Sequence, residues 1–189
     1  MSTIEYDEKH WCKLTRWDGT TKWNTQWGPG RTNSAAGYQR NSTWVAPGMG
    51  GLCSAAWVHF YQHPILASLL LPMHVAPSYT KLWRISAFGT IQHDPDKSGA
   101  VKVTTIEEIP LPKITLEQRV EILRRYGAGL LGEDGLFDDD DAGDYDADGV
   151  ACGLIDLLQN DAEKLSDPPD LVAIAEEVLA ESEVPEAKK

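Results

Sequence analysis

Residues 81–109 read KLWRISAFGTIQHDPDKSGAVKVTTIEEI, and this stretch decides the fold. Its first part, 81–92, alternates apolar and polar residues as a half-buried strand does. A turn rich in Asp, Pro and Gly occupies 93–99, and 100–109 is rich in the β-branched residues that favour strands. The pattern predicts a β-hairpin and therefore a small, mainly antiparallel sheet.

The segment before the hairpin predicts shorter elements. In chain order we expect a strand at 10–17, a turn at 18–19, a short strand at 23–27, a long loop at 31–51 and a strand or tight turn at 56–61. Pro64 fits the first position of a helix, where its missing N–H costs nothing. A short buried helix is therefore expected from Ile65 to Leu71, ended by Pro72.

The segment after the hairpin predicts a capped helix. Thr115-Leu-Glu-Gln118 is a capping-box pattern, in which the Thr and Gln side chains satisfy backbone N–H groups at the start of a helix. We expect this helix to run to about Tyr126. Gly127 and Gly129 are then expected to end it.

Charge and aromatic content divide the chain at Gly132. Residues 1–132 carry 14 Lys/Arg against 10 Asp/Glu, whereas 133–189 carry 3 against 19, within a total net charge of −12. All seven tryptophans lie between Trp11 and Trp83, so the packed core is expected in the first part of the chain. The sequence predicts an α+β body over 1–132, with two or three helices, and an acidic, partly helical segment over 133–189.

The acidic segment has a helical pattern of its own. A short helix is expected at 150–159, and a second helix is expected to begin at Asp167-Pro-Pro-Asp170. Apolar residues of this second helix share one face: Leu171, Ile174, Ala175, Val178 and Leu179. Such a face needs a packing surface, and both the body and a partner protein are candidates.

The three cysteines and the lack of targeting signals indicate the cellular compartment of the protein. Cys12, Cys53 and Cys152 form no dense disulfide framework, which is typical of a reduced intracellular protein. The N-terminus is too acidic and polar for a signal peptide, and the longest apolar run, 65–71, is too short to span a bilayer. We therefore expect a cytoplasmic protein with no membrane partner.

The sequence predicts no catalytic residues. Cys53 stands beside Ser54 with histidines nearby, which is a pairing used for nucleophilic catalysis. However, there is no nucleophile elbow, and no acidic residue occurs between Asp18 and Asp94. A non-enzymatic role is therefore expected.

One aromatic and basic set is a candidate ligand site. His59, Tyr61 and His63 alternate, so an extended chain would place all three on one face. With Trp57 lining the pocket and Arg84 supplying charge, these residues suit a nucleotide or a small signalling molecule. Hydrogen-bonded core or turn histidines are the alternative interpretation of the same pattern.

The acidic segment also contains a calcium-type spacing. Asp144, Asp146 and Asp148 precede Gly149, and three carboxylates at this spacing can reach one hard cation. The twelfth position, where a bidentate Glu belongs, is Ile155. The piece distantly resembles the calcium-binding module called excalibur, which would make these three aspartates calcium ligands.

The body is not expected to bind nucleic acid directly. Its positive charges are scattered, with Arg124-Arg125 the only adjacent pair, whereas phosphate-backbone binding needs a basic patch. Residues 133–189 suit the opposite role, because their negative charge can mimic nucleic acid in a basic groove of another protein.

Several strings of the body resemble a group of small bacteriophage and prophage proteins of unknown function. They are KLT at 13–15 with DG at 18–19, TQWG at 25–28, GLCS at 51–54, Trp57-x-His59-x-Tyr61, Pro64-x-Leu66-Ala67, Pro72-x-His74, Leu82-Trp83, EIPLP at 108–112 and EQR at 117–119. The resemblance spans roughly 12–126 and implies a phage setting. We therefore expect an accessory protein in the host cytoplasm that binds a host or phage macromolecule, with action against host defence as one role.

A second, more distant resemblance concerns the order of elements, which is similar to that of ADP-ribosyltransferase-like folds. It is an analogy of fold alone. Such an enzyme would need a catalytic Glu, for which Glu107 or Glu108 is the candidate. This enzyme is an alternative to the binding protein.

Overall fold

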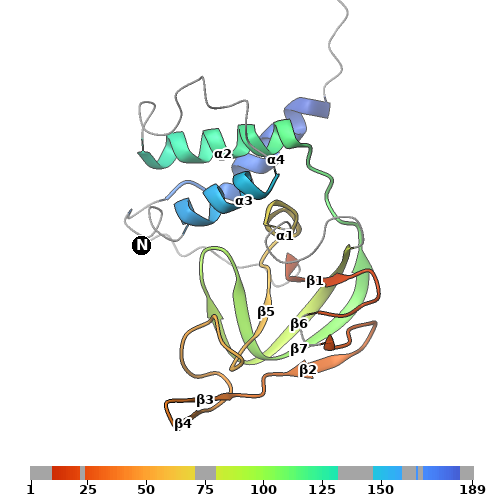
Figure 1. Cartoon of the computed structure of the whole chain (residues 1–189). Helices are drawn as coiled ribbons and strands as arrows, with labels where there is room; N and C mark the ends of the chain where they lie inside the picture. Colours follow the sequence, from red (N-terminus) through yellow and green to blue (C-terminus); the bar gives the residue numbers. More distant parts are fainter. Residues whose placement is uncertain are drawn as a thin grey trace, which may run out of the picture. The chain divides into compact units, whose positions relative to one another are not determined.

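The computed structural model describes residues 10–21, 24–70, 80–131, 147–158, 165 and 168–183 (Figure 1). Their contacts divide them into two compact units. The sheet unit comprises the described residues of 10–67 and 80–111, and the helical unit comprises those of 68–70 and 112–183.

The sheet unit confirms the α+β class and the predicted hairpin. Its strands are β1 (Cys12–Arg16), β2 (Thr32–Ser34), β3 (Tyr38–Arg40), β4 (Thr43–Val45), β5 (Val58–Phe60), β6 (Thr80–His93) and β7 (Ser98–Ile109). Strands β6 and β7 form the long antiparallel hairpin, and the main sheet has the order β1-β6-β7-β2. All strand pairings among the described residues are antiparallel, including the separate pair β3–β4.

Strand β5 closes this sheet on itself. It pairs with β7, and directly after it the backbone of Tyr61 meets that of Cys12 in β1. Each donates to the other, with Cys12 N to Tyr61 O at 2.9 Å and Tyr61 N to Cys12 O at 2.8 Å. The path β1-β6-β7-β5-β1 is therefore a small barrel, which leaves these strands with few unpaired edges.

The barrel encloses a tryptophan-rich core. Its buried members are Trp11, Trp27, Phe60, Trp83, Ile85, Ala100 and Val103. Two indole N–H groups of this core have hydroxyl partners: Trp83 Nε1 donates to Thr15 Oγ1 and Trp27 Nε1 to Thr21 Oγ1, both at 3.0 Å. The buried Nε1 of Trp11 has no hydrogen-bond partner among the described residues. Not every tryptophan is used in this way, because Trp17 and Trp44 are exposed.

The expectations for the chain before β5 were partly wrong. The predicted loop at 31–51 contains the three short strands β2, β3 and β4. Segment 23–27 was predicted as a strand, but of its described residues only Gln26 pairs, in an isolated bridge with Thr20, and Asn24 has a positive φ of 55°. Short strands of three residues carry too little periodicity to be recognised in a Gly- and Ser-rich context.

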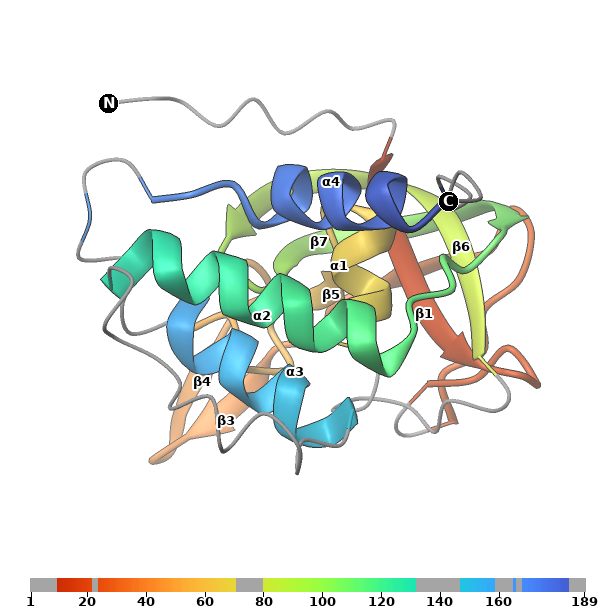
Figure 2. The same cartoon turned by 90° about the horizontal axis from the view of Figure 1, so that it is seen from above.

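The helical unit is built on α2 (Leu116–Leu131), against which α3 (Ala147–Asp156) and α4 (Leu171–Glu183) pack (Figure 2). The predicted capping box is present: Thr115 N donates to Gln118 Oε1 at 2.8 Å, and Gln118 N donates to Thr115 Oγ1 at 3.2 Å. The prediction that α2 ends near Tyr126 was wrong, since it continues to Leu131. Gly129 instead permits close packing, because a Cβ there would stand 3.2 Å from Pro169 Cγ.

A buried arginine of α2 caps a second helix. Helix α1 (Pro64–Leu69) begins at the predicted proline, and the division between the units falls inside it. Arg119 is only 8% exposed, and it donates to the carbonyls of Ser68 at 2.8 Å and Leu69 at 2.9 Å. Its Nε donates to Ile114 O at 3.2 Å. The guanidinium thus satisfies carbonyls that the end of α1 leaves without helical partners.

The unit boundary differs from the predicted domain boundary. The contacts divide the chain between Leu111 and Pro112, whereas the sequence prediction ended the body at Gly132. Helix α2 therefore groups with the helices of the acidic segment. Among the described helices, none combines the length and the apolar character that a membrane crossing requires.

Candidate functional site

The predicted ligand residues lie in different surroundings. Trp57 packs with Leu52 and Ala56 in a buried cluster, and its Nε1 donates to Gly50 O at 3.3 Å. His59 Nε2 is hydrogen-bonded to the Leu52 carbonyl. These two side chains therefore hold the 50–52 segment onto β5.

The other three predicted ligand residues each contact a different group. Tyr61 is buried, and burial together with the neighbouring charge of Asp96 raises the pKa of its hydroxyl. The ring of His63 lies 4.9 Å from that of His10. Arg84 is ion-paired with Glu107 at 2.5 Å. Tyr61 and Arg84 both stand opposite Cys12, one on each side of β1.

The neighbouring carboxylate on β7 is also ion-paired. Glu108 Oε2 lies 3.3 Å from Lys81 Nζ, and half of its side chain is exposed. The two glutamates considered for an ADP-ribosyltransferase thus both form ion pairs with cations of β6.

One titratable residue that sequence reasoning missed lies against the barrel core. Side chains along β1 point alternately to its two faces, and Lys13 is on the same face as the buried residues Trp11 and Thr15. Lys13 stands opposite Trp83 in the β1–β6 register. Its ammonium donates to the His59 carbonyl at 2.5 Å and lies 5.2 Å from the centre of the Trp27 ring.

This lysine has an unusual electrostatic environment. Burial lowers the pKa of Lys13 to about 8, against about 10.4 for a free lysine. Among the described residues no carboxylate forms an ion pair with it. In the sequence, this site could have been recognised from a charged residue on the buried face of a strand. The pattern was hidden because the next residue, Leu14, is buried as well, so β1 shows no clear alternation of buried and exposed positions.

The calcium-type spacing falls mostly outside the described residues. Asp144 and Asp146 are not among them, and Asp148 and Gly149 belong to the first turn of α3. Within the described part of the chain, no group of three His, Cys, Asp or Glu side chains is placed to hold a metal ion. The calcium site stays a prediction.

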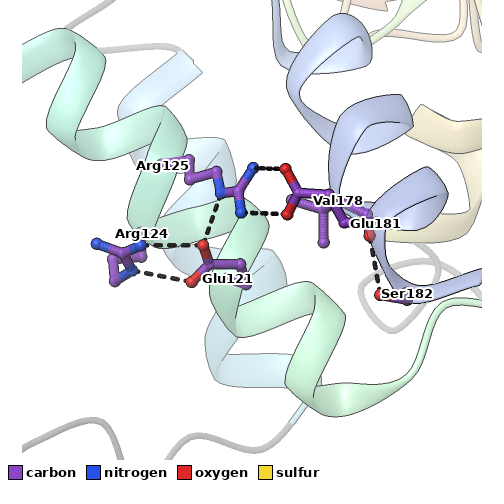
Figure 3. Close-up of polar contacts among 6 residues, drawn as sticks. All are labelled: Glu121, Arg124, Arg125, Val178, Glu181 and Ser182. Carbon is purple, nitrogen blue, oxygen red and sulfur yellow. Dashed lines mark hydrogen bonds and ion pairs between the residues drawn. The ribbon is translucent and has the colours of Figure 1, made fainter. Parts of the chain in front are cut away.

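The acidic helix α4 is fixed to α2 by its apolar face and by an arginine. Leu171, Ala175 and Val178 are buried, as the predicted amphipathic pattern requires. Figure 3 shows the fork of Arg125 on both oxygens of Glu181, at 3.0 and 2.6 Å.

The same arginine is held within α2. Its Nε donates to Glu121 at 2.6 Å, and Arg124 binds the same carboxylate through two bonds of 2.9 Å (Figure 3). The side chain of Arg125 is therefore positioned for Glu181 by its own helix. We name the exposed carboxylates of α4 and its cap, Asp170, Glu176, Glu177 and Glu181, the acidic face.

No protein-family model, curated protein or solved structure matches this chain. The geometry of the two units therefore supplies the functional proposals.

Proposed function

We propose that this is a non-enzymatic binding protein whose acidic face docks on a basic surface of a host or phage protein. One observation carries the proposal: α4 buries its apolar residues within its own unit and turns carboxylates to solvent. Its outer surface therefore offers charge rather than an apolar groove.

The geometry of α4 favours a specific contact over general solvation. Glu176 and Glu177 are consecutive exposed residues on a helix whose packing is fixed by Val178 and by the Arg125–Glu181 pair. Carboxylates held on a helix need less ordering on binding than those of a flexible chain, which lowers the entropic cost. Complementary charge also speeds encounter and makes the association sensitive to salt.

The resemblance to bacteriophage proteins supports the choice of partner. A phage setting supplies host proteins with basic nucleic-acid-binding grooves, and an acidic surface can occupy such a groove in place of the nucleic acid. We propose that this occupation counters a host function, with host defence as one target, in the host cytoplasm.

Charge substitution on the acidic face is the test. The double variant Glu176→Gln/Glu177→Gln removes two negative charges without touching the buried face of α4. A matched control, Glu107→Gln/Glu108→Gln, removes two negative charges from the exposed end of β7. Both variants and the original protein are used as baits in a host lysate at about 50 and 200 mM salt, since salt in this range weakens contacts made by charge.

The expected result is a basic, nucleic-acid-binding protein captured by the original protein and by the β7 control. Capture by the α4 variant is expected to fall about tenfold or more, and all capture is expected to weaken at the higher salt. Equal capture by the two double variants would refute the role of the acidic face. Deleting 133–189 is a poorer test, because it would strip α3 and α4 from buried residues of α2.

A further inference from the structure

We propose that the outward side of β2, β7 and β6, together with the β3–β4 hairpin, binds single-stranded nucleic acid. The site lies in the sheet unit and is independent of the acidic face. In the sequence the cations of the body are scattered, which was the reason not to expect nucleic-acid binding there. Strand pairing brings together side chains that the sequence keeps apart.

The strand register defines the surface. Six side chains lie in two rows across the three strands: Ser34, Lys102 and Phe88 in one row, and Thr32, Thr104 and Ser86 in the other. We name these six side chains the outer face. Directly opposed residues of an antiparallel sheet point to the same side, and the alternating positions Val103 and Ala87 pack on the barrel core. The two rows therefore point away from the core, where Phe88 is 50% exposed and Lys102 is exposed as well.

The charge of these strands favours an anionic ligand. Residues 19–93 contain no Asp or Glu, although 29 of the 189 residues of the chain are acidic. Strands β2, β3, β4 and β6 therefore carry no negative charge, and the two glutamates of β7 are both ion-paired with cations of β6. In the described part of the chain, no carboxylate pairs with the exposed cations Arg31, Arg40 and Lys102. These three cations are available to phosphate groups.

The β3–β4 hairpin adds a second exposed ring beside β2. Trp44 on β4 is 60% exposed, and it lies against Gly37, where a Cβ would stand 2.7 Å from the Trp44 ring. Gly37 follows Ser34 by three residues, so their Cα atoms are within about 11 Å of each other. Figure 1 shows the hairpin continuing from the end of β2. The Trp44 ring therefore stays close to the β2 end of the outer face, and Arg40 lies beside the turn of the same hairpin.

This combination of groups suits unpaired bases rather than a duplex. The rings of Phe88 and Trp44 can each stack on a base, and every base offers a face for stacking. The hydroxyls of Thr32 and Thr104, whose Oγ1 atoms lie 2.7 Å apart, can bind phosphate or sugar oxygens beside Lys102. A duplex would reach the cations but would keep its own bases stacked inside, away from the two rings. The arrangement therefore favours a single strand.

The experiment measures fluorescence anisotropy of a labelled oligothymidylate of about 20 nucleotides, which is long enough to cover one such site. The full chain is titrated at several salt concentrations between about 50 and 200 mM. An oligouridylate and a duplex of the same length are the parallel arms. We expect saturable binding of single strands at least tenfold tighter than of the duplex, and the stronger of the two single strands identifies DNA or RNA as the ligand. The logarithm of affinity should fall against the logarithm of salt with a slope of about −2, if three cations each contact one phosphate.

Substitutions separate the role of charge from that of stacking. Lys102→Gln is expected to make the salt slope shallower by about 0.7. Phe88→Ser and Trp44→Ser are each expected to weaken binding about fivefold or more with the slope unchanged, because they remove a stacking ring and no charge. Lys113→Gln and Trp17→Ser are the matched controls, since they remove an exposed cation and an exposed tryptophan outside the outer face and the hairpin. Both controls are expected to bind as the original protein does.

Four results would overturn the proposal. Two are read in the original chain alone: no saturable binding of either single strand, or binding of the duplex as tight as that of the single strands. The third is equal affinity of Phe88→Ser, Trp44→Ser and Trp17→Ser. The fourth is displacement of the oligonucleotide by polyglutamate as readily as by unlabelled oligothymidylate, which would show that the surface binds any acidic chain. The Glu176→Gln/Glu177→Gln variant is expected to bind the oligonucleotide normally, so this test and that of the acidic face give separate answers.

Discussion

Replacing Arg119 with Met is expected to cost about 3–5 kcal/mol of stability, which is large for one substitution. Met retains much of the apolar stem but donates no hydrogen bond. The carbonyls of Ser68, Leu69 and Ile114 then lose their partner together. A hydrogen bond to a charged group contributes about 1.5–3 kcal/mol, and the three share one donor group, so they do not add fully.

The helical unit can be followed separately in this experiment. All seven tryptophans lie at or before Trp83, within the chain segment that forms the sheet, so their fluorescence does not report on α2 to α4. Far-ultraviolet circular dichroism follows those helices. With a urea slope of about 2 kcal/mol per M, the expected loss moves the helical midpoint down by roughly 1.5–2.5 M.

Arg124→Met is the matched control, because the two arginines lie on the same helix. The side chain of Arg124 is 58% exposed and its partner Glu121 is three residues away. Exposed pairs of this kind contribute little, so the control is expected to change stability by about 0.5 kcal/mol or less. Equal helical midpoints for the two variants would refute the capping role assigned to Arg119.

Two further predictions concern the helical unit. Asp170→Ala is expected to cost about 1 kcal/mol in the same urea experiment, because Asp170 Oδ1 accepts from Val172 N and Ala173 N at 2.9 and 3.2 Å; Asp170→Asn, which can still cap, is the control. Hydrogen bonds from Arg124, and then from Arg125, lower the pKa of Glu121 to about 2 against the opposing effect of burial. This stabilisation is complete above the unfolded pKa of about 4.3 and is lost as the pH falls toward 2. The stability difference from Glu121→Gln is therefore expected to shrink over that window, and a constant difference would contradict the assignment.

The parts of the fold that sequence predicted are those with a long pattern or a specific motif. The β6–β7 hairpin spans enough residues for its alternation to be unambiguous, and the Thr115–Gln118 motif has a defined hydrogen-bond geometry. The amphipathic pattern of α4 was read correctly for the same reason. In each case local chemistry and tertiary packing favour the same structure.

The parts that were missed depend on tertiary contacts. Gly129 looks like a helix terminator, but its lack of a side chain serves the approach of Pro169 from a distant segment. The closure of the barrel at Cys12 and Tyr61 joins positions far apart in the chain, and no local pattern encodes it. Lys13 reads as an ordinary surface lysine until the partners of β1 are known, because its environment is supplied by Trp27, His59 and Trp83.

The cap that Arg119 places on α1 also has a consequence for synthesis. The arginine lies 50 residues after Leu69 in the chain. At bacterial-type elongation rates of about 5–20 residues per second, it follows Leu69 from the ribosome by roughly 3–10 s. During that interval the last carbonyls of α1 have only water as a partner. The end of this short helix is therefore expected to be frayed in the nascent chain and to become ordered when α2 is translated.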